Sequence, residues 1–242
     1  MTAGPQIRVG TQQPQSTRLV CATRVGINEF FATTALGRSV TRFFGASYPC
    51  DLRLFPHNSQ GLPAVYNEAV ATAQPHTELF IFLHDDLWLP DLFWLESVAA
   101  GLAHFDVIGI VGNRRHYPRQ LSCAFAGSSR EFDSPQHLSG RIGIGRDPYP
   151  EFISCYGDTP AQCALLDGLF LAVRRRTLET ANLRFDERFL FHCYDMDFCR
   201  QASAHGLRLG TWPISVVHGS KGEVGSLAWQ RDYAAYLEKY GE

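Results

Sequence analysis

Short apolar runs and segments with helix-spaced apolar residues alternate along most of the chain. The first run, TRLVCATR (residues 17–24), is of strand type, and residues 27–44 then carry apolar side chains at helical spacing. The alternation continues through the first half of the sequence. It predicts further strands at residues 51–55, 79–83 and 106–113, and further helices at residues 62–73 and 90–103.

The pattern weakens between residues 114 and 162, where Arg, Ser, Gly and Pro are frequent and only RIGIG (residues 141–145) indicates a strand. We expect this excursion to line one side of a site. The pattern of strands and helices becomes clear again from residue 164 onward. The pattern then predicts a strand leading into a helix at residues 164–181, a helix from Asp195 onward, a strand within residues 206–222 and an amphipathic helix at residues 229–240.

Strands that alternate with helices of this length predict an α/β domain, with a mainly parallel, Rossmann-like sheet flanked by helices on both faces. The chain has 242 residues, 45% of them hydrophobic, which is enough for one large core. We therefore expect a single domain over residues 18–242. Residues 1–17, which are rich in Gln, Pro and Thr, are expected to form a flexible leader.

Charge and cysteine content exclude several classes of protein. The formal net charge is -2, so nothing in the balance favours nucleic acid or an anionic membrane as a partner. The seven cysteines are odd in number and contain no C-x-x-C pair, which argues against a disulfide framework or a zinc knuckle. The sequence has no signal-peptide pattern and no apolar run of about 18 residues. We expect a cytoplasmic protein without an integral membrane segment.

Two adjacent carboxylates interrupt the apolar stretch LFIFLHDDLWLP (residues 79–90). His84, Asp85 and Asp86 follow a predicted strand, and ligands of open parallel sheets bind beyond the carboxyl ends of strands. Adjacent buried carboxylates repel each other unless a cation or N–H donors offset the charge. A divalent cation with phosphate ligands is one interpretation. The other is that Asp86 or Asp91 simply caps the following helix.

A second candidate group is VVHGSKG, which ends the last predicted strand. His218 offers an imidazole nitrogen to a cation, which would favour Mn²⁺ over Mg²⁺, although a lone histidine is more often structural. The flanking glycines allow close backbone approach to a ligand, and Lys221 offers a positive charge to a phosphate.

The third candidate group is the acidic pair Asp195 and Asp197, near the start of a predicted helix. Two positions two residues apart on a helix do not share one face, so we expect unequal roles. One carboxylate would point into the site as a proton acceptor, and the other would cap the helix or pair with an arginine such as Arg200. The structural alternative is a capping aspartate and a solvated one.

Taken in order, LFIFLHDD, LLDGLFLAVRR, FDERFLFHCYDMDFC and the terminal His218 resemble a GT-A glycosyltransferase of the family 2 type. The likeness spans roughly residues 18–240 and is nearest to a bacterial subgroup in which HDD replaces the usual D-x-D. The resemblance implies that His84, Asp85 and Asp86 bind the nucleotide-sugar diphosphate with Mn²⁺ or Mg²⁺, Asp86 being the direct ligand. It also implies that Asp195 is the catalytic base, with Tyr194 in place of the family's Glu.

The resemblance assigns further positions to the substrates. Asp167 and Gly168 match the family's acidic-Gly element near the acceptor, and the turn NSQGLPAVYN makes Asn58, Gly61 and Asn67 candidates for donor binding. For the family's Asp after its second strand, which binds the nucleotide base, DLRLFPHN offers only Asn58 or the earlier Asp51. Trp88 and Trp94 could stack on a sugar, but aromatic residues at this spacing more often belong to the core, as we expect for Trp94.

These features predict a metal-dependent glycosyltransferase that moves a sugar from a nucleotide-diphosphate donor to a hydroxyl of a glycan or other acceptor, with inversion. Two alternatives remain at this point. One is a catalytically silent GT-A module that binds a nucleotide sugar or glycan. The other is a metal-dependent hydrolase in which His84, Asp85, Asp86 and His218 activate water.

Overall fold

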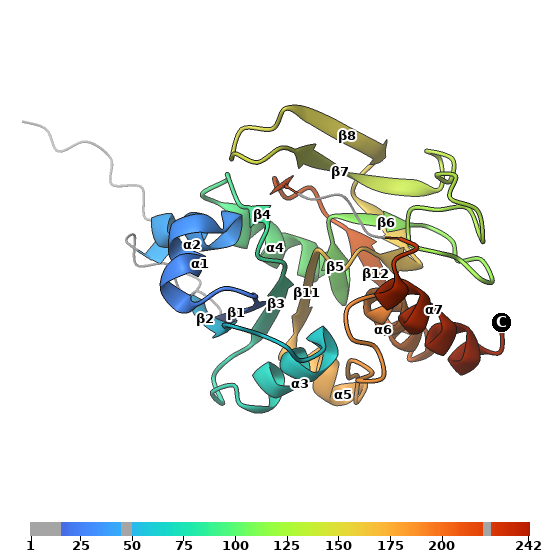
Figure 1. Cartoon of the computed structure of the whole chain (residues 1–242), viewed down its shortest axis with the longest axis horizontal. Helices are drawn as coiled ribbons and strands as arrows, with labels where there is room; N and C mark the ends of the chain where they lie inside the picture. The colour runs from blue at the N-terminus through green and yellow to red at the C-terminus, as the bar shows by residue number, and fades with distance from the viewer. Residues whose placement is uncertain (1–15, 45–49, 220–223) are drawn as a thin grey trace, which may run out of the picture.

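The computed structural model describes residues 16–44, 50–219 and 224–242, which form two β-sheets and the helices around them (Figure 1). The predicted leader therefore lies almost entirely outside the described residues. The strands are β1 (Thr17–Ala22), β2 (Cys50–Phe55), β3 (Leu79–Leu83), β4 (Leu87–Trp88), β5 (Val107–Gly109), β6 (Val111–Asn113), β7 (Leu138–Ile144), β8 (Phe152–Gly157), β9 (Ala161–Cys163), β10 (Leu165–Leu166), β11 (Phe170–Arg174), β12 (Leu209–Thr211) and β13 (Val217–His218). The helices are α1 (Ile27–Thr33), α2 (Ala35–Phe44), α3 (Leu62–Ala71), α4 (Trp94–His104), α5 (Arg175–Thr180), α6 (Tyr194–Ala204) and α7 (Leu227–Tyr240).

The larger sheet has the strand order β2-β1-β3-β11-β5-β12-β9. Strands β2, β1 and β3 are parallel neighbours, and β5 and β12 are parallel to each other. Strand β11 lies between β3 and β5 and is antiparallel to both. Strands β2, β1, β3, β5 and β12 therefore run the same way, which confirms a mainly parallel sheet. The reversed β11 was not predicted.

Helices cover both faces of this sheet, as predicted. On one face, Val20, Phe80 and Phe82 of the strands pack with side chains of α3, α5, α6 and α7. On the other face, strand residues such as Leu19 and Ile81 pack against α1, α2 and α4. These strands are buried on both sides, which is why they appear in the sequence as nearly continuous apolar runs.

The smaller sheet, β10-β6-β7-β13-β4 with β8 beside β7, takes its two longest strands, β7 and β8, from the segment whose pattern was weak. RIGIG falls mainly in β7, but the expectation of a single short strand there was wrong, because β8 also lies within residues 114–162 and β9 begins there. The predicted strand at residues 106–113 is divided between the two sheets at Ile110. The expected strand at residues 206–222 is likewise divided, into β12 and β13.

The helix boundaries differ from the predictions by more than two residues, or break unexpectedly, at two places. The segment at residues 27–44 breaks at Thr34, whose hydroxyl donates to the Phe30 carbonyl at 2.8 Å. Helix α4 begins at Trp94 rather than Pro90, because Asp91 accepts the Phe93 N–H at 2.8 Å and forms a turn before the helix. Trp94 is fully buried, which confirms it as a core residue.

Candidate active site

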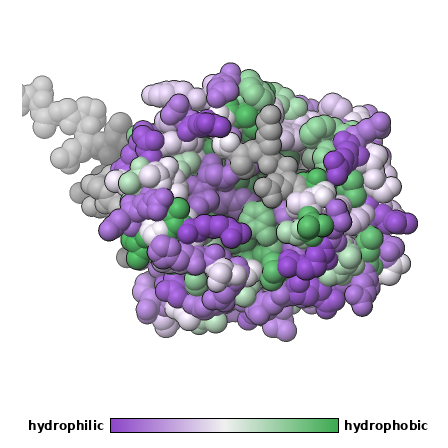
Figure 2. Space-filling model, in the orientation of Figure 1, coloured by the Kyte–Doolittle hydropathy of each residue, from purple (hydrophilic) through white to green (hydrophobic). Residues whose placement is uncertain are grey.

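The candidate site lies where β3 ends and β11 begins. Because β11 is antiparallel to β3, with Phe170 opposite Leu83, the residues before β11 lie beside the residues after β3. The His84 N–H donates to the Leu169 carbonyl at 3.2 Å and extends this pairing. The sheet therefore brings residues 84–86 next to Asp167 and Gly168. In the view of Figure 2, the molecular surface is hollowed near its centre, below the smaller sheet.

His84, Asp86 and His218 form a three-residue group whose ligand atoms lie within 4.8 Å of one another. Strand β13 pairs with β4, so His218 lies opposite Leu87. The Gly219 N–H also donates to the Asp86 carbonyl at 3.2 Å. As a result, His218 Nε2 lies 3.2 Å from Asp86 Oδ2. Two imidazoles and one carboxylate are a donor set that fits a divalent transition metal such as Mn²⁺.

The two histidines of this group have different electrostatic environments. Burial lowers the pKa of His84, and the nearby Asp86 and Asp167 oppose this only in part. Burial also disfavours the charged form of His218, but the hydrogen bond and the charge of Asp86 outweigh it and raise the pKa of His218. A neutral imidazole is the form that binds metals, so His84 is kept in the binding form by its surroundings.

Asp85 makes contacts of a different kind from its two neighbours. Its Oδ2 accepts a hydrogen bond from the Thr23 hydroxyl at 2.6 Å, and its carbonyl accepts the Leu36 N–H at 3.0 Å. Asp85 thus connects the end of β1 and the start of α2 to the site. We did not single out Thr23 from the sequence, although it follows β1 directly and the strand-end rule that identified His84 applies to it equally.

Asp195 points toward the turn that precedes β11. Its Oδ2 accepts the Gly168 N–H at 2.9 Å, and its Oδ1 accepts the Met196 N–H at 2.9 Å. Burial and the charge of Asp167 raise the pKa of Asp195 to about 7, despite these hydrogen bonds. A carboxyl group with this pKa can accept a proton near neutral pH and hold it long enough to pass it on.

Asp197 is fully buried and faces away from that turn. Its carboxylate lies 2.6 Å from Lys239 Nζ and accepts hydrogen bonds from the Tyr240 hydroxyl at 2.7 Å and from Gln201 at 2.6 Å. The two aspartates thus make unequal contacts, as the helical geometry predicts. The suggested partner Arg200 was wrong, because Arg200 instead pairs with Glu242 at 2.7 Å.

Asp167 is half-buried, and Gly168 is buried. Asp167 Oδ1 accepts the Leu169 N–H at 2.9 Å, and the Cys123 thiol lies 3.8 Å from its Oδ2. A Cβ at position 168 would collide with the Tyr194 hydroxyl and would lie 3.0 Å from the Asp195 side chain. Glycine at this position is therefore what allows α6 to approach β11.

The remaining predicted residues occupy separate places. The Asn58 N–H donates to the Thr23 carbonyl at 2.8 Å, so Asn58 lies at the same edge of the sheet, with its side chain bonded to the Gln60 backbone. Asn67 lies in α3 and bonds to the backbone of Phe185 and to Glu187. Lys221 lies outside the described residues. Gly61 precedes α3 and packs against Leu190.

Two features at the loop before α6 were missed by sequence reasoning. Phe191 stacks on His84, with ring centroids 5.7 Å apart and planes 30° apart, and it remains 47% exposed. Asp232 of α7 is buried and accepts the backbone N–H groups of Leu190, Phe191 and His192 at 3.0–3.2 Å. Asp232 thus holds the loop whose aromatic ring lies over the candidate metal group.

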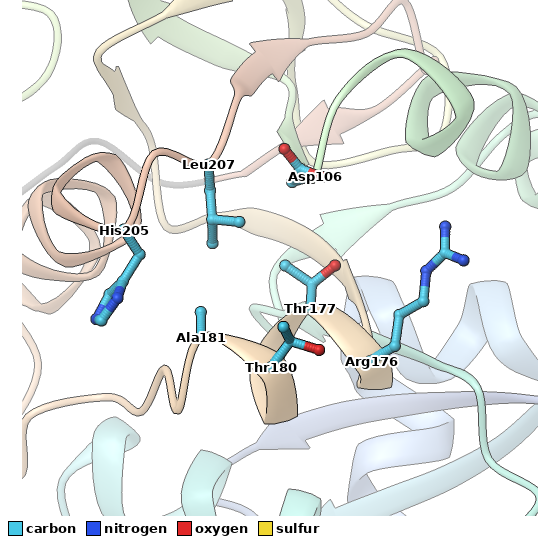
Figure 3. A pocket seen from close by; sticks show the side chains of 7 residues that line it. All are labelled: Asp106, Arg176, Thr177, Thr180, Ala181, His205 and Leu207. Carbon is cyan, nitrogen blue, oxygen red and sulfur yellow. The ribbon is translucent and has the colours of Figure 1, made fainter.

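A separate pocket of about 430 Å³ lies at the opposite end of the sheet (Figure 3). Asp106 and Leu207, which line it, come just before β5 and β12, and Arg176 follows β11. Its lining residues are Asp106, Arg176, Thr177, Thr180, Ala181, His205 and Leu207. None of the predicted site residues belongs to it.

Comparison with known proteins was informative for the fold. No family model matches the chain, and no curated protein matches its sequence. A solved structure of GalNAc-T7 with UDP, GalNAc and Mn²⁺ matches with a TM-score of 0.53 and 11% identity, over 94% of this chain and 48% of that one. Two others have lower scores. The catalytic domain of Drosophila β1,4-galactosyltransferase 7 with xylobiose matches with a TM-score of 0.44 and 12% identity, over 81% of this chain and 63% of that one. Staphylococcus aureus TarS 1–349 matches with a TM-score of 0.46 and 13% identity, over 84% of this chain and 60% of that one.

The chain has the GT-A fold, with its mixed central sheet flanked by helices. It spans about half the length of the GalNAc-T7 structure that it matches. At these identities the likeness establishes the fold and leaves the chemistry to the residues of the site. Among the described residues, none of the helices combines the length and the apolar character needed to cross a bilayer.

Proposed function

We propose that the chain is a metal-dependent glycosyltransferase that moves a sugar from a nucleotide-diphosphate donor to a hydroxyl acceptor, with inversion at the anomeric carbon. The observation that carries this proposal is that the metal group and a proton acceptor lie next to each other at one edge of the sheet. His84 of the metal group contacts Tyr194, and the adjacent Asp195 has a pKa raised to about 7. A cation-binding group beside a proton acceptor is what such a transfer requires.

In this proposal, His84, Asp86 and His218 hold Mn²⁺ or Mg²⁺. The nitrogen ligands favour Mn²⁺, because Mg²⁺ prefers oxygen ligands only. The bound cation would neutralise the diphosphate as it leaves. Lys221 follows His218 by three positions in the sequence, and we assign to it a second positive charge for the same diphosphate.

Asp195 accepts the proton of the acceptor hydroxyl. As the hydroxyl oxygen forms its bond to the anomeric carbon, the bond from that carbon to the diphosphate oxygen breaks and its electron pair leaves with the diphosphate. Attack from the face opposite the leaving group inverts the configuration. We assign the acceptor side of this arrangement to Asp167 and Gly168, next to Asp195. We assign the donor side to Asp85, Asn58 and Asn67. Asp85 is held there by its hydrogen bond with Thr23.

The experiment is a transfer assay with the native chain, a panel of nucleotide sugars, Mn²⁺ and a panel of hydroxyl acceptors. Glycosylated product and free nucleoside diphosphate are both quantified, with Asp195→Asn assayed in parallel. Product that depends on Asp195 supports the proposal. Equal release of nucleoside diphosphate with and without acceptor would instead indicate a hydrolase. Donor binding without release or transfer would indicate a silent binding module.

A further inference from the structure

We infer that Tyr194 is a positioning residue for the metal group: its hydroxyl fixes the ring and the tautomer of His84 so that Nδ1 is the nitrogen that binds the cation. This inference rests on the metal group of the proposed function and goes beyond it, because it concerns a residue that is not itself a ligand. It arises from one contact, in which Tyr194 Oη lies 3.1 Å from His84 Nε2.

The hydrogen-bond roles in this contact follow from a second one. The Tyr194 hydroxyl donates its single proton to the Gly168 carbonyl at 2.9 Å. With that proton committed, Oη can only accept a hydrogen bond from His84. His84 Nε2 must then carry the ring proton, which leaves the lone pair on Nδ1. Metal-bound histidines commonly have this arrangement, with one nitrogen on the metal and the other donating to a nearby acceptor.

The surroundings of Tyr194 hold the hydroxyl in place. The residue is 2% exposed, and its ring packs edge-on against Tyr66, with centroids 5.9 Å apart. A Cβ on residue 168 would collide with the Tyr194 hydroxyl, so this approach requires glycine there. The acceptor that orients His84 is therefore as rigid as the core around it.

Two departures from the family pattern are in contact with each other through this hydrogen bond. By the resemblance described above, His84 takes the place of the first aspartate of D-x-D, and Tyr194 takes the place of the glutamate before the base. A histidine ligand usually donates its second ring N–H to a nearby acceptor, and a buried tyrosine hydroxyl supplies one without adding a negative charge beside Asp195. The pairing also links the metal group directly to the residue next to the base.

The test uses two measurements on the full chain without any sugar donor. The first is the tautomer of His84 in the metal-free chain, from two-bond ¹H–¹⁵N spectra of histidine-labelled protein, with the His84 signal assigned by its loss in His84→Gln. We expect the Nε2–H form. The second is Mn²⁺ affinity, measured by titration calorimetry, for the native chain and for Tyr194→Phe. We expect the variant to bind Mn²⁺ about 10- to 100-fold more weakly.

The matched control is Tyr236→Phe, which removes another buried tyrosine hydroxyl, bonded at 3.1 Å to Arg200. It should bind Mn²⁺ as the native chain does. In a His84→Gln background, Tyr194→Phe should produce no further loss, because its effect passes through His84. An Nδ1–H tautomer in the native chain overturns the inference, whether or not Tyr194→Phe folds. So does unchanged Mn²⁺ affinity in a folded Tyr194→Phe.

These results are distinguishable from failure of the proposed function. A chain that binds Mn²⁺ through the expected tautomer but transfers no sugar would overturn the proposed transfer and leave the role of Tyr194 intact. A native chain that binds neither Mn²⁺ nor Mg²⁺ would overturn both the metal group and this inference.

Discussion

The Asp195 carboxylate accepts a hydrogen bond from the backbone N–H of Gly168 at 2.9 Å, which joins the first turn of α6 to the turn before β11. The contact orients Asp195 toward the edge of the sheet that carries His84. It also places Asp195 near Asp167, and burial together with that negative charge makes Asp195 a stronger base than an ordinary aspartate.

Replacing Asp195 with Asn is expected to lower the rate of sugar transfer by about 10²- to 10⁴-fold, because a positioned general base contributes a factor of that order. Donor binding should be retained, since the side chain keeps its size. The measurement is product formation, with donor affinity determined on the same samples. Native transfer by Asp195→Asn would exclude Asp195 as the proton acceptor.

The pH dependence of transfer should report the pKa of Asp195. Transfer should require the ionised carboxylate, so the rate should fall about tenfold per pH unit below a pH of about 7. Replacing Asp167 with Asn removes a negative charge that raises this pKa, so the acid limb should move to lower pH. An acid limb that stays at the same pH in Asp167→Asn would show that Asp167 does not set the pKa of Asp195.

Rising pH should lower the free energy of unfolding through Asp195, whereas it should raise the rate of transfer. An unfolded aspartate has a pKa of about 3.9, so between about pH 4 and pH 7 the folded chain holds a proton that the unfolded chain releases. Rising pH across this window therefore destabilises the native chain, whereas Asp195→Asn lacks this effect. From pH 5 to pH 7, the variant should gain about 2 kcal/mol in unfolding free energy relative to the native chain. Urea unfolding at the two pH values measures the difference, and a constant difference would contradict the raised pKa.

Much of the sheet was predictable because its central strands are buried on both faces and leave uninterrupted apolar runs in the sequence, as LFIFL shows. The direction of β11 was not, because a strand's own pattern does not say which neighbours it joins. The division of residues 106–113 was also hidden, since both halves are apolar and only their partners, β11 and β7, place them in different sheets.

The site was predictable to the extent that its residues follow strand ends. That rule identified His84, Asp86 and His218, which the structure brings into one group. It gave no sign of Asp232, which acts on the site from the middle of the last helix through contacts about 40 positions away in sequence. The role of Tyr194 was likewise invisible, because it depends on the distance between two residues in separate elements.

Mn²⁺ binding should depend on Asp86 and hardly at all on the adjacent Asp85. Asp86→Ala removes a member of the metal group and is expected to abolish measurable Mn²⁺ binding, whereas Asp85→Asn should bind Mn²⁺ nearly as the native chain does. The reason is that Asp85 is bonded to the Thr23 hydroxyl, and the Asp86 carboxylate faces His218. Titration calorimetry with Mn²⁺ measures both variants. Retained Mn²⁺ affinity in Asp86→Ala would exclude this group as the metal site.

Asp232 should stabilise both the fold and the loop over the site. Its carboxylate accepts three backbone N–H groups, and Asp232→Ala leaves these donors without that acceptor, which we expect to cost about 2–4 kcal/mol of unfolding free energy. Asp232→Asn keeps one acceptor oxygen and should lose less. Urea unfolding at pH 7 compares the three chains.

The pH dependence of this stabilisation has a defined sign. Hydrogen bonds from His192, Phe191 and Leu190, with Arg231, outweigh burial and lower the pKa of Asp232. The contribution of the charge is therefore fully present above the unfolded pKa of about 3.9 and is lost as the pH falls through the folded value. The advantage of the native chain over Asp232→Asn should shrink below about pH 4. If this advantage were instead the same at pH 3 and pH 7, the lowered pKa of Asp232 would be contradicted, and its negative charge would add nothing to the hydrogen bonds that hold the loop.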